Sequence, residues 1–177
     1  MPAVLRIDRP VEGEYAPYYG RYIEQVTHDD VLPLLETQNE TTQQTLGRVD
    51  ESRAMHRYAP GKWSVKEVVQ HMCDVERVFA YRALRMARGD QTPLAAFEQD
   101  DYVASSAADR RTLADLVDEF AHLRAANLLM FRNLEPAAWE RTGTASDNPF
   151  VVCAFPYILA GHERHHRRVL AERYLPG

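Results

Sequence analysis

The sequence predicts an all-α fold, a four-helix bundle formed by one domain over residues 1–177. Four long segments begin and end at residues typical of helix caps and turns, and apolar side chains recur within them at helical spacing. Hydrophobic residues make up 45% of the chain and charged residues 27%, a balance typical of a globular protein with a packed core. A chain of 177 residues is long enough for one such core and short for two.

An N-terminal arm and a first helix open the chain. Residues 1–28 carry scattered tyrosines and prolines without a sustained period, so we expect an arm that packs over the other elements. A helix is predicted from Asp29 or Asp30, where an acidic cap is followed by Pro33 in the first turn, to about Val49.

The second helix has the clearest start signal. After a loop over 50–63 with room for one helical turn, Ser64 and Glu67 form a capping-box pattern, in which each side chain accepts a hydrogen bond from a backbone N–H near the other. The helix is predicted to run to about Arg88, and Gly89 ends it.

A long connection over 89–111 precedes the third helix. Its length favours a crossover between distant helix ends over a tight antiparallel turn. Thr112 with Asp115 caps the third helix, and apolar residues then follow the 3.6-residue period as far as Leu134.

The C-terminal part is predicted to hold a short turn, a loop and a last helix. Pro136 can begin a short turn, and the small and polar residues of 143–148 are typical of a loop. The last helix is predicted over 148–174, where Pro156 either kinks it or marks its true first turn.

Composition argues against several classes of partner. The formal charge of −5 would repel a nucleic-acid backbone, so nucleic acid is not an expected partner. The basic cluster Arg164, Arg167 and Arg168 is interpreted as a solvated helix face. Only Cys73 and Cys153 are present, and neither a signal peptide nor a membrane-spanning apolar run is visible. These features together predict a cytoplasmic protein.

Three histidines lie on inward-facing stripes. His71 takes a place in the second helix where the period calls for an apolar residue, and His162 and His166 are four apart on one face of the last helix. A lone inward histidine is typically a hydrogen-bonded core residue, but two adjacent buried imidazoles favour a metal. With His71 as third ligand, open positions would remain for water or substrate, as in catalytic sites. Zinc or nickel is the expected ion, with iron as a further candidate. A hydrogen-bonded core cluster without metal is the alternative.

Neighbouring residues supply candidates for proton transfer or for orienting the ligands. The segment 162–166 matches the HExxH pattern, in which the glutamate acts as general base, so Glu163 is one candidate for proton transfer. The alternative is that Glu163 is a solvated carboxylate or one that supports the ligands. Asp74 and Glu76 are the other two candidates for proton transfer or ligand orientation. His165 could replace His166 as ligand but lies toward the flank of the stripe. Cys73 should face away from the site.

Several segments resemble the DinB-like and YfiT-like superfamily. The resemblance is carried by 62–76 (KWSVKEVVQHMCDVE), 88–90 (RGD) and 160–166 (AGHERHH), and it extends to 15–23 and 97–103. It implies a four-helix bundle in up-down-down-up order. It also implies a three-histidine metal site at the positions of His71, His162 and His166.

The resemblance and the site together favour a metalloenzyme. Members of the superfamily include transferases and isomerases that use low-molecular-weight thiols, and proteins described as metal-dependent hydrolases. We therefore expect a small-molecule substrate, with such a thiol as one candidate, and either hydrolysis or thiol transfer. The alternative is a non-catalytic, metal-stabilised or stress-related binding module. A homodimer is compatible with a bundle of this kind, although the sequence shows no heptad seam for it.

Overall fold

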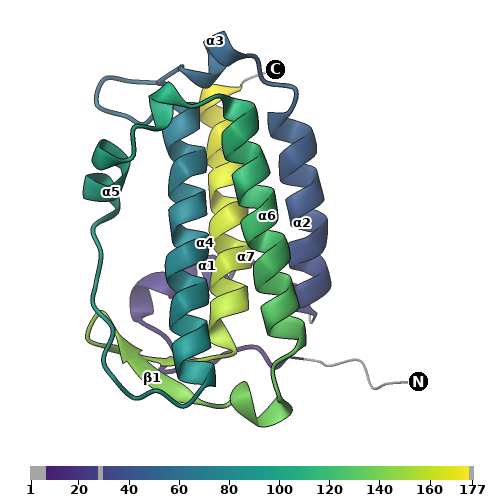
Figure 1. The fold of residues 1–177 in the computed structure, drawn as a ribbon, viewed down its shortest axis with the longest axis vertical. Helices are drawn as coiled ribbons and strands as arrows, with labels where there is room; N and C mark the ends of the chain where they lie inside the picture. Colours follow the sequence, from purple (N-terminus) through teal and green to yellow (C-terminus); the bar gives the residue numbers. More distant parts are fainter. Residues whose placement is uncertain (1–6, 28–29, 176–177) are drawn as a thin grey trace.

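The bundle helices run in up-down-down-up order, as the family resemblance implied (Figure 1). The structure is a computed structural model that describes residues 7–27 and 30–175. Figure 1 shows the first and the last of the bundle helices rising and those between them in sequence descending. In this described part, the four long helices are α2 (Val31–Leu46), α4 (Val65–Ala87), α6 (Leu113–Arg132) and α7 (Ala154–Val169). None of its helices is both long and apolar enough to cross a membrane.

The crossover between α4 and α6 follows from their parallel direction. A chain that leaves the lower end of α4 must return to the upper end before α6 can run down beside it, and Figure 1 shows the connection climbing the outside of the bundle. The sequence predicted this crossover but not the short helices within it, α5 (Gln99–Ser105) and η2 (Ala108–Arg110).

Helix starts agree closely with the capping signals. Ser64 and Glu67 form both hydrogen bonds of the capping box before α4, and Thr112 accepts from the backbone N–H of Asp115 before α6. Asp30 precedes α2 but makes no capping hydrogen bond with its side chain. The other candidate cap, Asp29, lies outside the described residues. The loop before α4 contains the expected helical turn, α3 (Glu51–Ala54).

The N-terminal arm packs on α7 because a glycine lets the two backbones approach. The arm contains η1 (Pro17–Tyr19) and α1 (Gly20–Ile23), and α1 lies against α7. A Cβ atom at Gly161 would lie 2.0 Å from the carbonyl oxygen of Tyr22. Any side chain at position 161 would therefore push the arm away from α7.

The region before α7 corrects the sequence prediction. Residues expected as loop and as the start of the last helix form an antiparallel hairpin of β1 (Thr142–Ala145) and β2 (Asn148–Val151). Ser146 and Asp147 turn the hairpin with positive φ angles of 50° and 59°. The helix itself begins at Ala154, so Pro156 stands in its first turn, one of the two predicted outcomes. The remaining elements are η3 (Pro136–Ala138), which confirms the expected turn, and η4 (Leu170–Tyr174).

A polar layer crosses the middle of the bundle between two apolar clusters. The lower cluster includes Phe79, Phe131 and Phe155, and the upper one includes Met72 and Phe120. Between them every long helix contributes buried polar side chains. They are Gln38 and Thr42 from α2, His71 and Glu76 from α4, Arg124 and Asn127 from α6, and His162, Glu163 and His166 from α7. This polar layer contains all three predicted ligands.

Candidate metal centre

His71 points into the bundle from the upper half of α4. The capping box fixes where this helix starts, and the apolar positions Val68 and Val75 on the same face set its rotation. The His71 side chain consequently occupies the inward position that the sequence predicted, with 3% of its surface exposed.

His162 and His166 extend from consecutive turns of α7 toward His71. They are 7% and 9% exposed, and their rings meet edge to face with centroids 4.4 Å apart. The Nε2 atom of His162 lies 3.0 Å from the Nε2 atoms of both His71 and His166. The three histidines thus direct the same ring nitrogen toward one point, within 4.8 Å of one another.

The three imidazoles are neutral at ordinary pH. Burial lowers the pKa of His71 to about 4, with a smaller effect from nearby His165. Burial and, after it, the neighbouring imidazoles hold the pKa values of His162 and His166 well below the usual 6.5. A neutral imidazole carries one N–H and one acceptor lone pair. The cluster therefore has no net charge and an unshared lone pair for each ring.

Hydrogen bonds within the cluster cannot satisfy all three nitrogens. The Nε2 atom of His162 faces two partners, but it has either one proton to donate or one in-plane lone pair to offer. A divalent transition ion would accept a lone pair from each ring. In a tetrahedral zinc site, nitrogen ligands at about 2.0 Å from the ion lie about 3.3 Å apart, close to the 3.0 Å that separates the His162 nitrogen from those of His71 and His166. The donor set fits a metal better than a metal-free cluster.

Two cavities flank the histidines. A small one of about 50 Å³ touches His71 and His162 and is walled mainly by aromatic rings, including Tyr22 and Phe97. A larger one of about 270 Å³ touches His166 and is more polar, with Lys62 and Asp100 among its lining residues. The histidines are therefore buried within the bundle but line a cavity on each of two sides.

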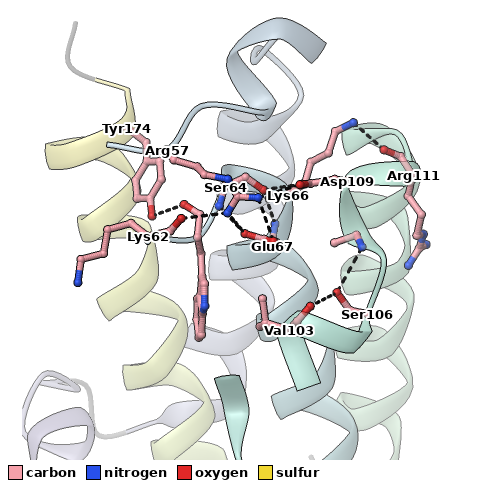
Figure 2. Close-up of polar contacts among 12 residues, drawn as sticks. Arg57, Lys62, Ser64, Lys66, Glu67, Val103, Ser106, Asp109, Arg111 and Tyr174 are labelled. Carbon is pink, nitrogen blue, oxygen red and sulfur yellow. Dashed lines mark hydrogen bonds and ion pairs between the residues drawn. The ribbon is translucent and has the colours of Figure 1, made fainter. Parts of the chain in front are cut away.

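Aromatic rings outside the bundle helices hold the ligand rings in place. Tyr22 from α1 lies edge-on to His162 at 5.4 Å, and Trp63 lies 4.9 Å from His71. The Tyr174 hydroxyl donates to the Trp63 carbonyl at 2.8 Å (Figure 2). Sequence reasoning missed both contacts, because residues in loops and short turns carry no periodic signal.

The segment next to Trp63 is tied to the crossover. In Figure 2 the side chain of Asp109, from η2, accepts hydrogen bonds from Ser64 and Arg57, each at 2.8 Å. The ammonium group of Lys66 donates to the Arg111 carbonyl at 2.6 Å. These contacts fix the start of α4, and with it the height of His71 in the bundle.

Glu163 and Glu76 meet around Arg124, which the sequence reasoning did not single out. Arg124 is 1% exposed and forms ion pairs with Glu163 at 2.6 Å and with Glu76 at 2.7 Å. Asn127 donates to the same Glu76 carboxylate at 2.8 Å, and Thr42 donates to Glu163 at 2.5 Å. Among the described residues, no hydrogen bond joins either carboxylate to the three imidazoles. The two acids lie in the polar layer beside the histidines.

The remaining candidate residues lie outside the group of three converging histidines. Asp74 is half-buried and accepts a hydrogen bond from Gln70 at 3.0 Å, and burial raises its pKa. His165 is half-buried, with its ring 5.1 Å from that of His166 and 5.6 Å from that of Tyr22. Cys73 is packed in the upper apolar cluster, where its thiol donates to the Leu116 carbonyl at 3.6 Å.

The bundle order and the polar layer define a class of helical protein with a histidine group between α4 and α7. The family model of the DinB superfamily matches residues 34–170. The chain belongs to that superfamily, as its resemblance predicted. No curated protein matches the chain in sequence.

Two solved structures share the fold at low sequence identity. YfiT from Bacillus subtilis, described as a probable metal-dependent hydrolase with an unusual four-helix bundle topology, is 16% identical with a TM-score of 0.69, over 89% of this chain and 86% of YfiT. A mycothiol-dependent maleylpyruvate isomerase is 13% identical with a TM-score of 0.68. That match covers 85% of this chain and 63% of the isomerase, which is therefore the longer protein.

Proposed function

We propose that the protein is a metalloenzyme in which His71, His162 and His166 hold one divalent transition metal, zinc or nickel in preference to iron. The observation that carries the proposal is the convergence of three buried, neutral Nε2 atoms that cannot satisfy one another. Three imidazole ligands leave further coordination positions free, which is typical of catalytic rather than structural sites.

The proposed reaction is hydrolysis or the transfer of a low-molecular-weight thiol to a small molecule. When bound, such an ion lowers the pKa of a coordinated water or thiol, so that the deprotonated nucleophile is available near neutral pH. The descriptions of the two similar structures, a metal-dependent hydrolase and a thiol-dependent isomerase, support these two reactions. The cavities beside His162 and His166 offer room for substrate groups on both sides of the site.

The chain's own carboxylates take the orienting role in this proposal. Glu163 follows His162 directly and Glu76 lies on the helix of His71, so their shared ion pairs with Arg124 hold α7 and α4 in register. Of the two roles that the sequence allowed, proton transfer and orientation, these contacts support orientation. Among the described residues, Asp74 forms no ion pair with Arg124 and no hydrogen bond with a histidine. We therefore propose it only as a helix surface carboxylate.

The surroundings of the enzyme are also part of the proposal. Cys73 and Cys153 are both free and buried, which suits a reducing cytoplasm. The expected partner is a small molecule and not a nucleic acid, since the chain carries a net negative charge. Homodimerisation stays a prediction.

Metal content of the tag-free protein, purified without added metal, tests the site. We expect about one equivalent of zinc, nickel or iron per chain, lost in His166→Ala because two imidazoles hold an ion much less tightly than three. His122→Ala is the matched control, since the His122 ring is exposed and, among the described residues, hydrogen-bonded only to the Asp118 carbonyl. The proposal is wrong if the native protein takes up no metal even after incubation with zinc or nickel.

A cobalt-loaded sample separates a catalytic site from a closed structural one. Cobalt(II) reports its ligands in the visible spectrum, so a thiol that enters an open coordination position produces a thiolate-to-cobalt band. We expect that band on titration with a small thiol. A spectrum that stays unchanged with thiols and with small anions would instead support the metal-stabilised binding module.

A further inference from the structure

A groove of about 530 Å³ lies between α2 and α7, away from the histidines. It shares no lining residue with either cavity beside the histidines. One wall carries Thr37, Thr41 and Thr45, which are four residues apart and share one face of α2. The other wall carries Arg164, Arg167 and Arg168 from α7. The groove is larger than either cavity beside the histidines, and the proposed metal chemistry does not use it.

The arginine wall has no acidic counterpart among the described residues. Within the described residues, Arg167 and Arg168 make no hydrogen bond or ion pair, and Arg164 donates only to the Gln25 carbonyl, at 2.8 Å. The part of the chain that the structure describes places no aspartate or glutamate in the lining of the groove. Three like charges within little more than one helical turn repel one another, so an anion between the two walls would relieve that repulsion.

The upper end of the groove is apolar. The helices α2 and α7 run in the same direction, so their C-terminal ends meet at the top of the bundle (Figure 1). At that end the groove is lined by Leu46, Leu170, Ala171 and Leu175, above the level of the arginines. Leu170, Ala171 and Leu175 follow the arginines in the chain, beyond the end of α7 at Val169. A ligand that fills the groove needs a charged head and an apolar tail.

The threonine wall offers no positive charge to such a head group. The Thr41 and Thr45 hydroxyls donate to carbonyls one turn earlier, each at 2.8 Å, so their protons are already committed. The wall therefore presents methyl groups and hydroxyl oxygens without a charge. Positive charge comes only from α7, which places the anionic group on that side of the groove.

We propose that this groove binds an aliphatic carboxylate, with the carboxylate at Arg167 and Arg168 and the hydrocarbon chain toward Leu170 and Leu175. The inference is independent of the metal centre, because no ligand histidine lines the groove. It assigns a second binding site to the side of α7 that faces α2.

Calorimetric titration with octanoate tests the assignment. We expect one binding site per chain and an affinity at least about tenfold weaker in the double variant Arg167→Gln/Arg168→Gln, because charge-assisted hydrogen bonds to the carboxylate are lost. Arg88→Gln is the matched control, since Arg88 is exposed, lacks an ion pair among the described residues and lies outside the groove. Ala171→Trp should weaken binding without any change of charge, because its side chain fills the apolar end.

The probe series separates the two halves of the ligand. Acetate and octan-1-ol should each bind much more weakly than octanoate, since each lacks one half. Equal affinity for octanol and octanoate, or unchanged affinity in the double variant, would overturn the proposal. Sedimentation is measured on the same samples. If the native protein sediments as a dimer and the double variant as a monomer, the proposal is also overturned. The groove would then be assigned to a second copy of the chain.

Discussion

The two halves of the polar layer differ in how their buried polar groups are partnered. Around Arg124, groups of opposite charge meet and satisfy one another with hydrogen bonds from four helices. Around His162, three groups of the same kind converge, and no complementary partner faces them among the described residues. The Arg124 cluster finds its hydrogen-bond and ion-pair partners within the chain, whereas the described residues offer the histidine nitrogens no complementary group. Buried polar groups therefore mark function when their chemistry is left incomplete.

Removal of Arg124 is the largest expected perturbation. Arg124→Leu leaves the carboxylates of Glu76 and Glu163 buried without a counter-charge, so we expect the free energy of unfolding to fall by about 3–5 kcal/mol. Urea unfolding measures the change. The triple variant Arg124→Met/Glu76→Met/Glu163→Met should lose less than the single one, because no buried charge remains. A loss below about 1 kcal/mol in Arg124→Leu would break the contrast between the clusters.

Acid should destabilise the metal-free protein through the histidine cluster. The folded state holds the pKa of His71 at about 4, below the usual 6.5, so between these values the unfolded chain binds a proton that the folded one excludes. Stability is then fully present above about pH 6.5 and falls as the pH drops toward 4, by up to about 1.4 kcal/mol per pH unit for each such histidine. Chemical unfolding with a chelator present, at several pH values, measures the slope. His71→Gln should flatten it and His122→Ala should not.

Glu163→Gln distinguishes an anchor from a general base. The amide keeps the shape of the side chain but loses the charge opposite Arg124, so we expect a stability loss of about 1–3 kcal/mol with the metal content unchanged. Once an activity has been found, an anchoring role predicts a rate within about tenfold of the native value. A rate loss of about a hundredfold or more, with stability near native, would instead identify Glu163 as the base.

Asp74→Asn is expected to have the smallest effect. Asp74 is half-buried, has one hydrogen bond to Gln70 and belongs to neither cluster. We expect the free energy of unfolding to change by no more than about 0.5 kcal/mol. Metal content should stay native, and a measured loss of metal would place Asp74 in the site after all.

Local chemistry made much of the bundle predictable from sequence. The capping box at Ser64 and the cap at Thr112 set two helix starts, and helical periodicity placed His71 inside the bundle. The hairpin at 142–151 was not predicted, since its turn residues are those of a loop and its strands are only four residues long. Asn148 and Pro149 also look like a helix cap and first turn, but tertiary pairing overrides that signal.

The site was predictable as far as its side chains lie on long helices. The three histidines stand on periodic stripes, and so does Arg124, four residues after Phe120 and four before Leu128. That charged residue on an apolar stripe was the signal that could have revealed the ion-pair cluster. Tyr22 and Trp63 carry no such signal, because the contacts that place them, with Gly161 and with Tyr174, are tertiary features.

The separation of the histidines along the chain has a kinetic consequence. His71 and His162 are 91 positions apart, and α7 follows the other bundle helices, so the group can form only after α7 has left the ribosome and docked against α4. Because contacts of such long range cost much loop-closure entropy, we expect this group to form after the folding nucleus. An ion held there would slow unfolding without hastening folding, and would lengthen the lifetime of the finished protein.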